Sequence, residues 1–231
     1  MATERGRGRR AALFFCAAAC LAVAGGGCPT DGWIDGTQLD RLNCTMFIVE
    51  ENGQADVTAA ITSILGLPIE LSDGQAVEVN GQPLTGPDAR LEYSATIARA
   101  DTYLITAIEP TRGVQDTTVE PPAAFAISSP SEGGEASLSG FTVTWSNANP
   151  DLRVLVRLTQ DIFGQQRTFV SEMLTDEGSF TLTAEDLGDF QQGADLNITV
   201  RRIRQVSAIN GFKTGQVSVA RSRTVRCVPA P

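Results

Sequence analysis

The chain has 231 residues, 42% of them hydrophobic, and a formal net charge of −9. A chain this acidic is repelled by nucleic acid and anionic lipid surfaces, so its composition argues against a nucleic-acid partner. It contains no histidine, which excludes Ser-His-Asp and Cys-His catalytic sites and histidine-bound zinc.

Residues 1–27 are predicted to be an export signal that is removed from the working protein. Four arginines precede an apolar run, Ala11 to Ala24, which small residues follow. This is the layout of a secretory signal, and 14 apolar residues are too few for a permanent membrane helix. Removal of the segment takes away four arginines and one glutamate, so the remaining chain has a net charge of −12.

Two cleavage sites are open. The small residues Ala22 and Ala24 favour a cut before Gly25. The sequence "GGGC" at 25–28 resembles the lipobox of bacterial lipoproteins, and that resemblance implies a cut before Cys28 and acylation of Cys28. Residues 28–44 would then tether the first domain to a membrane. We expect the exported protein to be lipid-anchored in the cell envelope, at the outer membrane or cell surface. A soluble secreted or periplasmic form is the alternative.

Cysteine counting supports the lipoprotein alternative. Cys16 and Cys20 lie in the discarded segment, which leaves Cys28, Cys44 and Cys227. If Cys28 carries lipid, an even pair remains, and it is predicted to form a Cys44–Cys227 disulfide. A Cys28–Cys44 bridge with Cys227 free is the rival pairing.

Alternation of apolar and polar residues predicts an N-terminal β-rich domain at 45–118. The pattern is clear in "QAVEVNGQ", "RLEYSATI" and "TYLITAIEP". Asn80-Gly81 is a strong hairpin-turn dipeptide. A helix remains possible only at Val57 to Leu65, where β-branched residues make that interpretation ambiguous. A break rich in proline and polar residues follows at 109–125, and Pro121-Pro122 marks the predicted domain boundary.

The second predicted domain, residues 119–231, contains about seven short alternating segments, as an immunoglobulin-like sandwich does. "SGFTVTWSNANPDLRVLV" and "GSFTLTAEDLGDFQQGADLNITVRRI" resemble strand pairs of a fibronectin type III or Ig-like module, with Trp145 as the core tryptophan. The whole layout resembles uncharacterised Ig-like lipoproteins of bacteria. The expected fold is all-β, with two small antiparallel sandwich-like domains after the signal segment.

One set of residues is a candidate binding surface. Six arginines fall on the last two predicted strands, where neighbouring strands would gather them into a basic stripe for an anionic or acidic partner. Cross-strand charge pairing is the alternative explanation. The six are Arg201, Arg202, Arg204, Arg221, Arg223 and Arg226.

Two acidic clusters are weak calcium candidates. The first comprises Asp31, Asp35 and Asp40, and its spacing does not fit a calcium loop. The second lies between two predicted strands, where acidic side chains could instead cap a turn after Thr183. It comprises Glu185, Asp186 and Asp189. No metal site, cofactor or catalytic residue is predicted with a supporting motif.

The expected function is therefore non-catalytic: a structural or recognition module that contacts protein or glycan. An accessory or spacer module without a lipid anchor is the second interpretation. A hydrolase that uses paired carboxylates is the third. The only lysine, Lys213, lies in a turn-rich segment and is a poor candidate for a Ser–Lys dyad.

Overall fold

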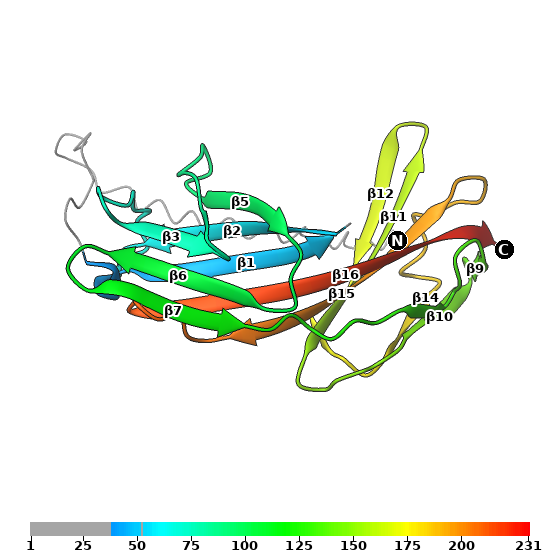
Figure 1. Ribbon diagram of the computed structural model, residues 1–231. Coiled ribbons are helices and arrows are strands. Elements are labelled where there is room, and N and C mark those ends of the chain that lie inside the picture. Colours follow the sequence, from blue (N-terminus) through cyan, green and yellow to red (C-terminus); the bar gives the residue numbers. More distant parts are fainter. Residues whose placement is uncertain (1–37, 52) are drawn as a thin grey trace, which may run out of the picture. The chain divides into compact units, whose positions relative to one another are not determined.

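The computed structural model describes residues 38–51 and 53–231, and these belong to one compact unit. The predicted signal segment, Cys28 and the first part of the predicted tether lie outside the described residues. Regular structure in these described residues consists of strands and one short 3-10 helix, η1 (Leu39–Arg41), so the predicted all-β class is confirmed (Figure 1). No helix in the described ranges is long and apolar enough to cross a membrane.

The largest sheet contains nine strands, and its main path runs β12-β11-β15-β16-β1-β2-β5. β13 pairs with β11, and β9 pairs with β16. β16 is parallel to β1 and to β9, and the other pairs are antiparallel. The nine strands are β1 (Asn43–Glu51), β2 (Gln54–Thr62), β5 (Tyr93–Ala98), β9 (Glu135–Ser137), β11 (Arg153–Ile162), β12 (Gln165–Val170), β13 (Leu174–Thr175), β15 (Leu196–Val206) and β16 (Thr214–Ala230).

Two smaller sheets contribute the other layers of two hydrophobic clusters. The four-stranded sheet is β4 (Gln82–Pro83), β3 (Ala76–Val79), β6 (Tyr103–Glu109) and β7 (Gly113–Val119). The three-stranded sheet is β14 (Ser179–Thr183), β10 (Gly140–Trp145) and β8 (Ile127–Ser129). We call the cluster with β3 and β6 the first sandwich and the cluster with β10 and β14 the second sandwich.

The ambiguous segment after Val57 is a strand, so the helical alternative is wrong. Within β2, Ala55, Val57, Ala59 and Ile61 are buried while their neighbours face outward. This period of two matches a strand with one buried face, and branched side chains at Val57 and Ile61 favour it. The strand pairs with β1 on one side and β5 on the other.

The polar break predicted at 109–125 contains a strand that the pattern did not reveal. β7 pairs with β6 along its whole length, yet only Val119 in it is buried. A strand whose side chains are nearly all exposed shows no hydrophobic alternation, which explains why the sequence missed it. The chain leaves the first sandwich after β7, at Val119 to Pro122.

The last two strands serve both sandwiches. β15 and β16 pair continuously from Leu196–Cys227 to Val206–Val217, and Figure 1 shows them extending from the first sandwich to the second. Val217 and Val219 belong to the first hydrophobic cluster, whereas Leu196 and Cys227 belong to the second. The first sandwich is built mainly from residues 38–119. It is completed by β15 and β16, which follow the other strands of the second sandwich in sequence.

Candidate functional site

The inward-facing side chains of β16 are apolar within each sandwich and include arginine where the two sandwiches meet. Val217 and Val219 face the first cluster, and Val225 and Cys227 face the second. Between them lie Arg221 and Arg223, since every second residue of a strand faces the same way. Arg202 of β15 lies directly opposite Arg221 in the ladder. Arg202 and Arg221 are buried at this junction, whereas Arg223 is exposed.

A buried carboxylate on β1, that of Glu50, neutralises Arg221 at the edge of the first sandwich. Glu50 occupies the inward position that follows Ile48 on β1, and its side chain is 1% exposed. Arg221 contacts both carboxylate oxygens of Glu50, and Nε of Arg99 lies 3.2 Å from Oε2. The hydroxyl of Tyr103 donates to Oε1 of Glu50 at 2.8 Å. Burial, and then this hydrogen bond to Glu50, raise the pKa of Tyr103, so the phenol stays protonated as a donor.

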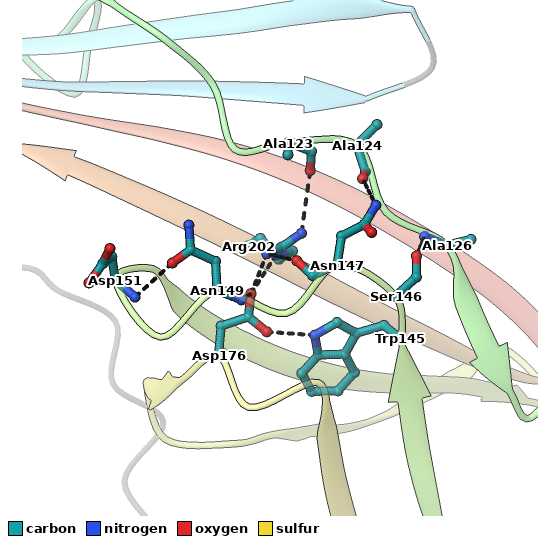
Figure 2. A network of polar contacts seen from close by, with 10 residues as sticks. All are labelled: Ala123, Ala124, Ala126, Trp145, Ser146, Asn147, Asn149, Asp151, Asp176 and Arg202. Carbon is teal, nitrogen blue, oxygen red and sulfur yellow. Dashed lines mark hydrogen bonds and ion pairs between the residues drawn. The ribbon is translucent and has the colours of Figure 1, made fainter.

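A second buried carboxylate neutralises Arg202. Asp176 lies directly after β13, and its Oδ2 accepts from Nε of Arg202 at 2.6 Å. Both side chains are fully buried. Oδ1 of Asp176 accepts from Nε1 of Trp145 at 2.7 Å, and Oδ2 also accepts from the backbone N–H of Asn149 (Figure 2). Every polar atom of this carboxylate is therefore hydrogen-bonded, which a buried charge requires.

The Arg202 guanidinium also holds the segment that joins the two sandwiches. It donates to the carbonyls of Ala123 and Asn147, and it lies 5.3 Å from the ring centroid of Phe125. The Asn147 amide donates to the carbonyl of Ala124 at 2.9 Å (Figure 2). A cation over an aromatic face is attracted to the ring. The linker after Pro122 is thereby fixed against the second sandwich beside the junction.

The prediction of one exposed basic stripe is wrong. Arg202 and Arg221 are buried in ion pairs, and Arg204 has a buried Nε without a partner among the described residues. Arg223 donates to the carbonyl of Phe125. Alternation places Arg201 and Arg226 on the opposite face of the sheet. The charge-pairing alternative fits better, because carboxylates far away in sequence neutralise the two buried arginines.

The two arginines on the opposite face have separate surroundings. Nε of Arg201 donates to the hydroxyl of Ser222, and burial lowers the pKa of Arg201. Arg226 forms an exposed ion pair with Asp195 at 3.3 Å. An exposed pair of this kind contributes little to stability.

The junction includes a small polar pocket beside Glu50. Its volume is about 90 Å³, and ligand pockets typically enclose roughly 300–1,000 Å³. The lining residues are Glu50, Glu51, Gly53, Arg99, Arg221 and Arg223. The charges that line it already pair with each other in part, so we assign the junction a structural role.

The second calcium candidate forms no cation site among the described residues. No group of three potential ligands occurs in residues 38–51 and 53–231. In the second cluster, Oδ2 of Asp186 accepts from the N–H and the hydroxyl of Thr183, so it caps the turn. In the first cluster, Asp40 pairs with Arg112, while Asp31 and Asp35 lie outside the described residues.

The predicted Cys44–Cys227 disulfide is wrong. Both cysteines are free and buried. Cys44 lies opposite Gly215 of β16, and Cys227 is 12 residues further along that same strand. A strand rises about 3.3 Å per residue, so roughly 40 Å separate the two, whereas bridged cysteines have Cα atoms within about 7 Å. Cys44 and Cys227 are therefore two separate core thiols.

We expect both thiols to be unreactive in the folded protein. Burial raises the pKa of Cys44 to about 12, and burial together with nearby Glu132 raises the pKa of Cys227 to about 11. Iodoacetamide at neutral pH should modify neither cysteine until the chain is unfolded, when both react. Mass spectrometry of native and denatured samples measures this. Rapid modification of Cys44 or Cys227 in the native sample would contradict the burial of that thiol.

The same shifts predict lower stability in alkali. Each thiol has a higher pKa in the folded chain than the unfolded value of about 8.5. Its contribution to the free energy of unfolding is therefore complete below pH 8.5 and decreases as the pH rises toward 11–12. Urea unfolding at neutral pH and near pH 10 should show this decrease. In the Cys44→Ala variant the decrease should be smaller. An equal decrease in wild type and variant would contradict the assignment to Cys44.

Comparison with known proteins yields only distant structural likeness. No protein-family model and no curated protein matches this sequence. The chain is similar to the chicken CNTN1 FN1–FN3 domains, with 13% identity, 81% of this chain and 66% of that chain covered, and a TM-score of 0.25. For a Salmonella alpha-2-macroglobulin mutant the identity is 10%, the coverages are 84% and 15%, and the TM-score is 0.27. The likeness is a distant one to fibronectin type III or Ig-like β-sandwich domains, and no functional argument is drawn from it.

Sequence patterns missed the two carboxylates that organise the junction. The available signal was a charged residue at an inward-facing position of an alternating strand. Glu50 follows Cys44, Met46 and Ile48 at spacings of two, so the pattern itself places it inside. A buried carboxylate needs a buried cation, and Arg221 occupies the corresponding kind of position in β16.

Proposed function

We propose that this protein is an exported, lipid-anchored, non-catalytic module that holds a recognition surface at a fixed distance from a membrane of the bacterial envelope. The anchor is Cys28, which resembles a lipobox cysteine. The partner would be a protein or a glycan. One end of the protein would be anchored and the other would bind the partner. The protein would therefore act as a spacer, which requires that the distance between its two ends stays fixed.

The observation that carries this proposal is the β15–β16 pair, which serves both sandwiches without interruption. Two domains joined by a flexible linker move independently by default. Here, by contrast, bending at the junction would break backbone ladders and separate Arg221 from Glu50. It would also disturb the contacts of Arg202 with Ala123 and Asp176. A continuous sheet with buried ion pairs supports a rigid spacer.

The two ends of this body differ in a way that suits the proposal. The predicted tether enters at Asn43, which pairs with Thr214 at the start of β16. The β11–β12 hairpin lies beyond the other end of the β15–β16 ladder, since Gln160 pairs with Leu196 and Leu196 pairs with Cys227. At about 3.3 Å per residue, the ladder from Thr214 to Cys227 extends for roughly 43 Å. At the tip of the hairpin Phe163 is fully exposed, and we infer that it is a partner contact.

Intact mass tests the anchor. The protein is isolated separately from membrane and soluble fractions of the bacterium. We expect a membrane-bound species that begins at Cys28 and carries added acyl mass, with no change in mass on reduction. A soluble species that begins at Gly25 would overturn the lipid anchor and favour the secreted accessory module.

Distance measurement tests the rigid spacing. Spin labels are attached at Lys213→Cys and Gln165→Cys in the chain that carries Cys28→Ser, two exposed positions at opposite ends of the body, while the buried thiols of Cys44 and Cys227 stay unlabelled. We expect one narrow distance distribution on the order of 50 Å. Adding Glu50→Ala and Asp176→Ala should broaden it, and the exposed-pair variant Asp195→Ala should not. A broad distribution in the otherwise native chain would contradict the spacer.

A further inference from the structure

A short turn after β2 exposes three aliphatic side chains to solvent. Ile64, Leu65 and Leu67 are 62%, 82% and 54% exposed. They belong to the 63–67 turn, which lies between Thr62 and Pro68, two residues joined by an isolated bridge. Clustered exposed aliphatic residues are costly in water, and such a cluster indicates an interaction surface.

The turn is built so that its backbone donors point inward. The hydroxyl of Ser63 accepts from the N–H groups of Leu65 and Leu67, and the carbonyl of Ser63 accepts from Gly66. The N–H of Ser63 in turn donates to the carbonyl of Leu67 at 2.8 Å. Three consecutive backbone donors are therefore satisfied within the turn. This removes much of the penalty for moving a backbone segment into an apolar medium.

The turn lies at the end of the first sandwich where the tether enters. Thr62 pairs with Asn43 across the β1–β2 ladder, and the Asn43 amide donates to the carbonyl of Ser63 at 3.1 Å. In Figure 1 this is the end at which β1 begins and β2 ends. Exposed Arg41 and Lys213 lie at the same end, because Lys213 donates from its backbone N–H to the carbonyl of Leu42. Long cationic side chains next to apolar groups suit a membrane interface.

We propose that the 63–67 turn is a second membrane contact, whose aliphatic side chains enter the bilayer interface beside the lipid anchor. This inference rests on the proposed anchoring of Cys28. Asn43 follows Cys28 by 15 residues, which span at most about 54 Å when extended. A tether of that length keeps the turn at a high effective concentration near the bilayer. Shallow insertion would then orient the sandwiches relative to the membrane.

The chemistry of the turn favours lipid over a protein partner. Its exposed groups are purely aliphatic, whereas the side chains that dominate protein–protein contacts are enriched in Trp, Tyr and Arg. The three side chains extend from a short turn closed by the Thr62–Pro68 bridge, and entering a fluid phase needs no matching groove. The occupant is therefore the acyl region of a bilayer.

Vesicle binding by a chain without lipid tests this contact. The protein is expressed without residues 1–27 and with Cys28→Ser, and its partition is measured on phosphatidylcholine vesicles, which carry no net charge. The test variant adds Ile64→Ser, Leu65→Ser and Leu67→Ser. The matched control replaces three exposed apolar residues of the second sandwich, Val170→Ser, Met173→Ser and Val228→Ser. Circular dichroism confirms that each variant is folded.

We expect weak binding of the parent and a loss of at least about tenfold in the turn variant, while the control binds as the parent does. No binding by the parent, equal binding by parent and turn variant, or an equal loss in the control would each overturn the inference. The outcome is separable from the proposed function: if the native protein carries acyl mass on Cys28 but the turn variant partitions normally, the anchor stands and the second contact falls.

Discussion

Replacing Asp176 with alanine will destabilise the protein by about 3–5 kcal/mol, since it leaves the buried Arg202 guanidinium without its counter-charge. The same change removes the acceptor of the Trp145 indole N–H, a second buried donor. Denaturation in urea, followed by circular dichroism, gives the free energy of unfolding. The fluorescence of Trp145 should also change, because the indole N–H loses the carboxylate that accepts from it.

The matched control for Asp176 is a carboxylate that pairs with arginine at the surface. Asp195 contacts Arg226 at 3.3 Å, and both side chains are more than half exposed. The Asp195→Ala variant should lose no more than about 1 kcal/mol. The double variant Asp176→Leu with Arg202→Met replaces both charges by apolar groups and should recover much of the loss. A loss below about 1 kcal/mol for Asp176→Ala would show that Arg202 does not depend on this carboxylate.

Replacing Glu50 with alanine will cost a similar amount, about 3–5 kcal/mol, because it leaves Arg221 buried beside Arg99 with no carboxylate between them. Tyr103 is fully buried and loses its acceptor as well. Urea unfolding again gives the free energy. The neighbouring exposed residue supplies the control: Glu51→Ala should change stability by at most about 1 kcal/mol.

The Glu50→Gln variant separates charge from shape. It keeps a hydrogen-bond acceptor for Tyr103 but removes the counter-charge of Arg221. We expect a free energy of unfolding between those of wild type and Glu50→Ala, since a neutral acceptor is a weaker partner for a guanidinium. If glutamine proved as stable as glutamate, the role of Glu50 would be hydrogen bonding alone, and the ion-pair account of the junction would be wrong.

Local sequence patterns were sufficient for the strands that have one buried face. "QAVEVNGQ" became β3, a turn at Asn80-Gly81 with positive φ at both residues, and β4. The segment "TYLITAIEP" became β6, and "LRVLV", at the end of the first Ig-like segment, became the start of β11. In each case the alternation reports which side chains are buried, and that is a property of neighbouring residues alone.

The long-range pairings lay beyond such patterns. β1 and β16 pair in parallel although Glu50 and Arg221 are 171 residues apart in sequence. Nothing in either segment identifies its partner, because β-strand pairing depends on the surrounding fold. The basic stripe was predicted wrongly for this reason. The sequence showed that the arginines lie on two adjacent strands, but it did not show that carboxylates from β1 and from the residue after β13 pair with them.

The cysteine prediction failed for a different physical reason. Parity counting assumes that thiols in an exported protein pair with each other. Cys44 and Cys227 instead occupy inward positions of two alternating strands, where a thiol packs as a small apolar side chain. Reading the strand alternation around each cysteine, rather than the number of cysteines, would have placed both of them in a core.

Cooperative unfolding of the two sandwiches is the most direct test of the central claim, that β15 and β16 join them into one rigid body. Hydrogen exchange at increasing urea concentration, read by mass spectrometry, compares the amides of β2 in the first sandwich with those of β11 in the second. The account predicts that both sets reach one common free energy of opening and one common dependence on urea. Two separate unfolding events, with β2 or β11 exchanging while the other stays protected, would contradict it.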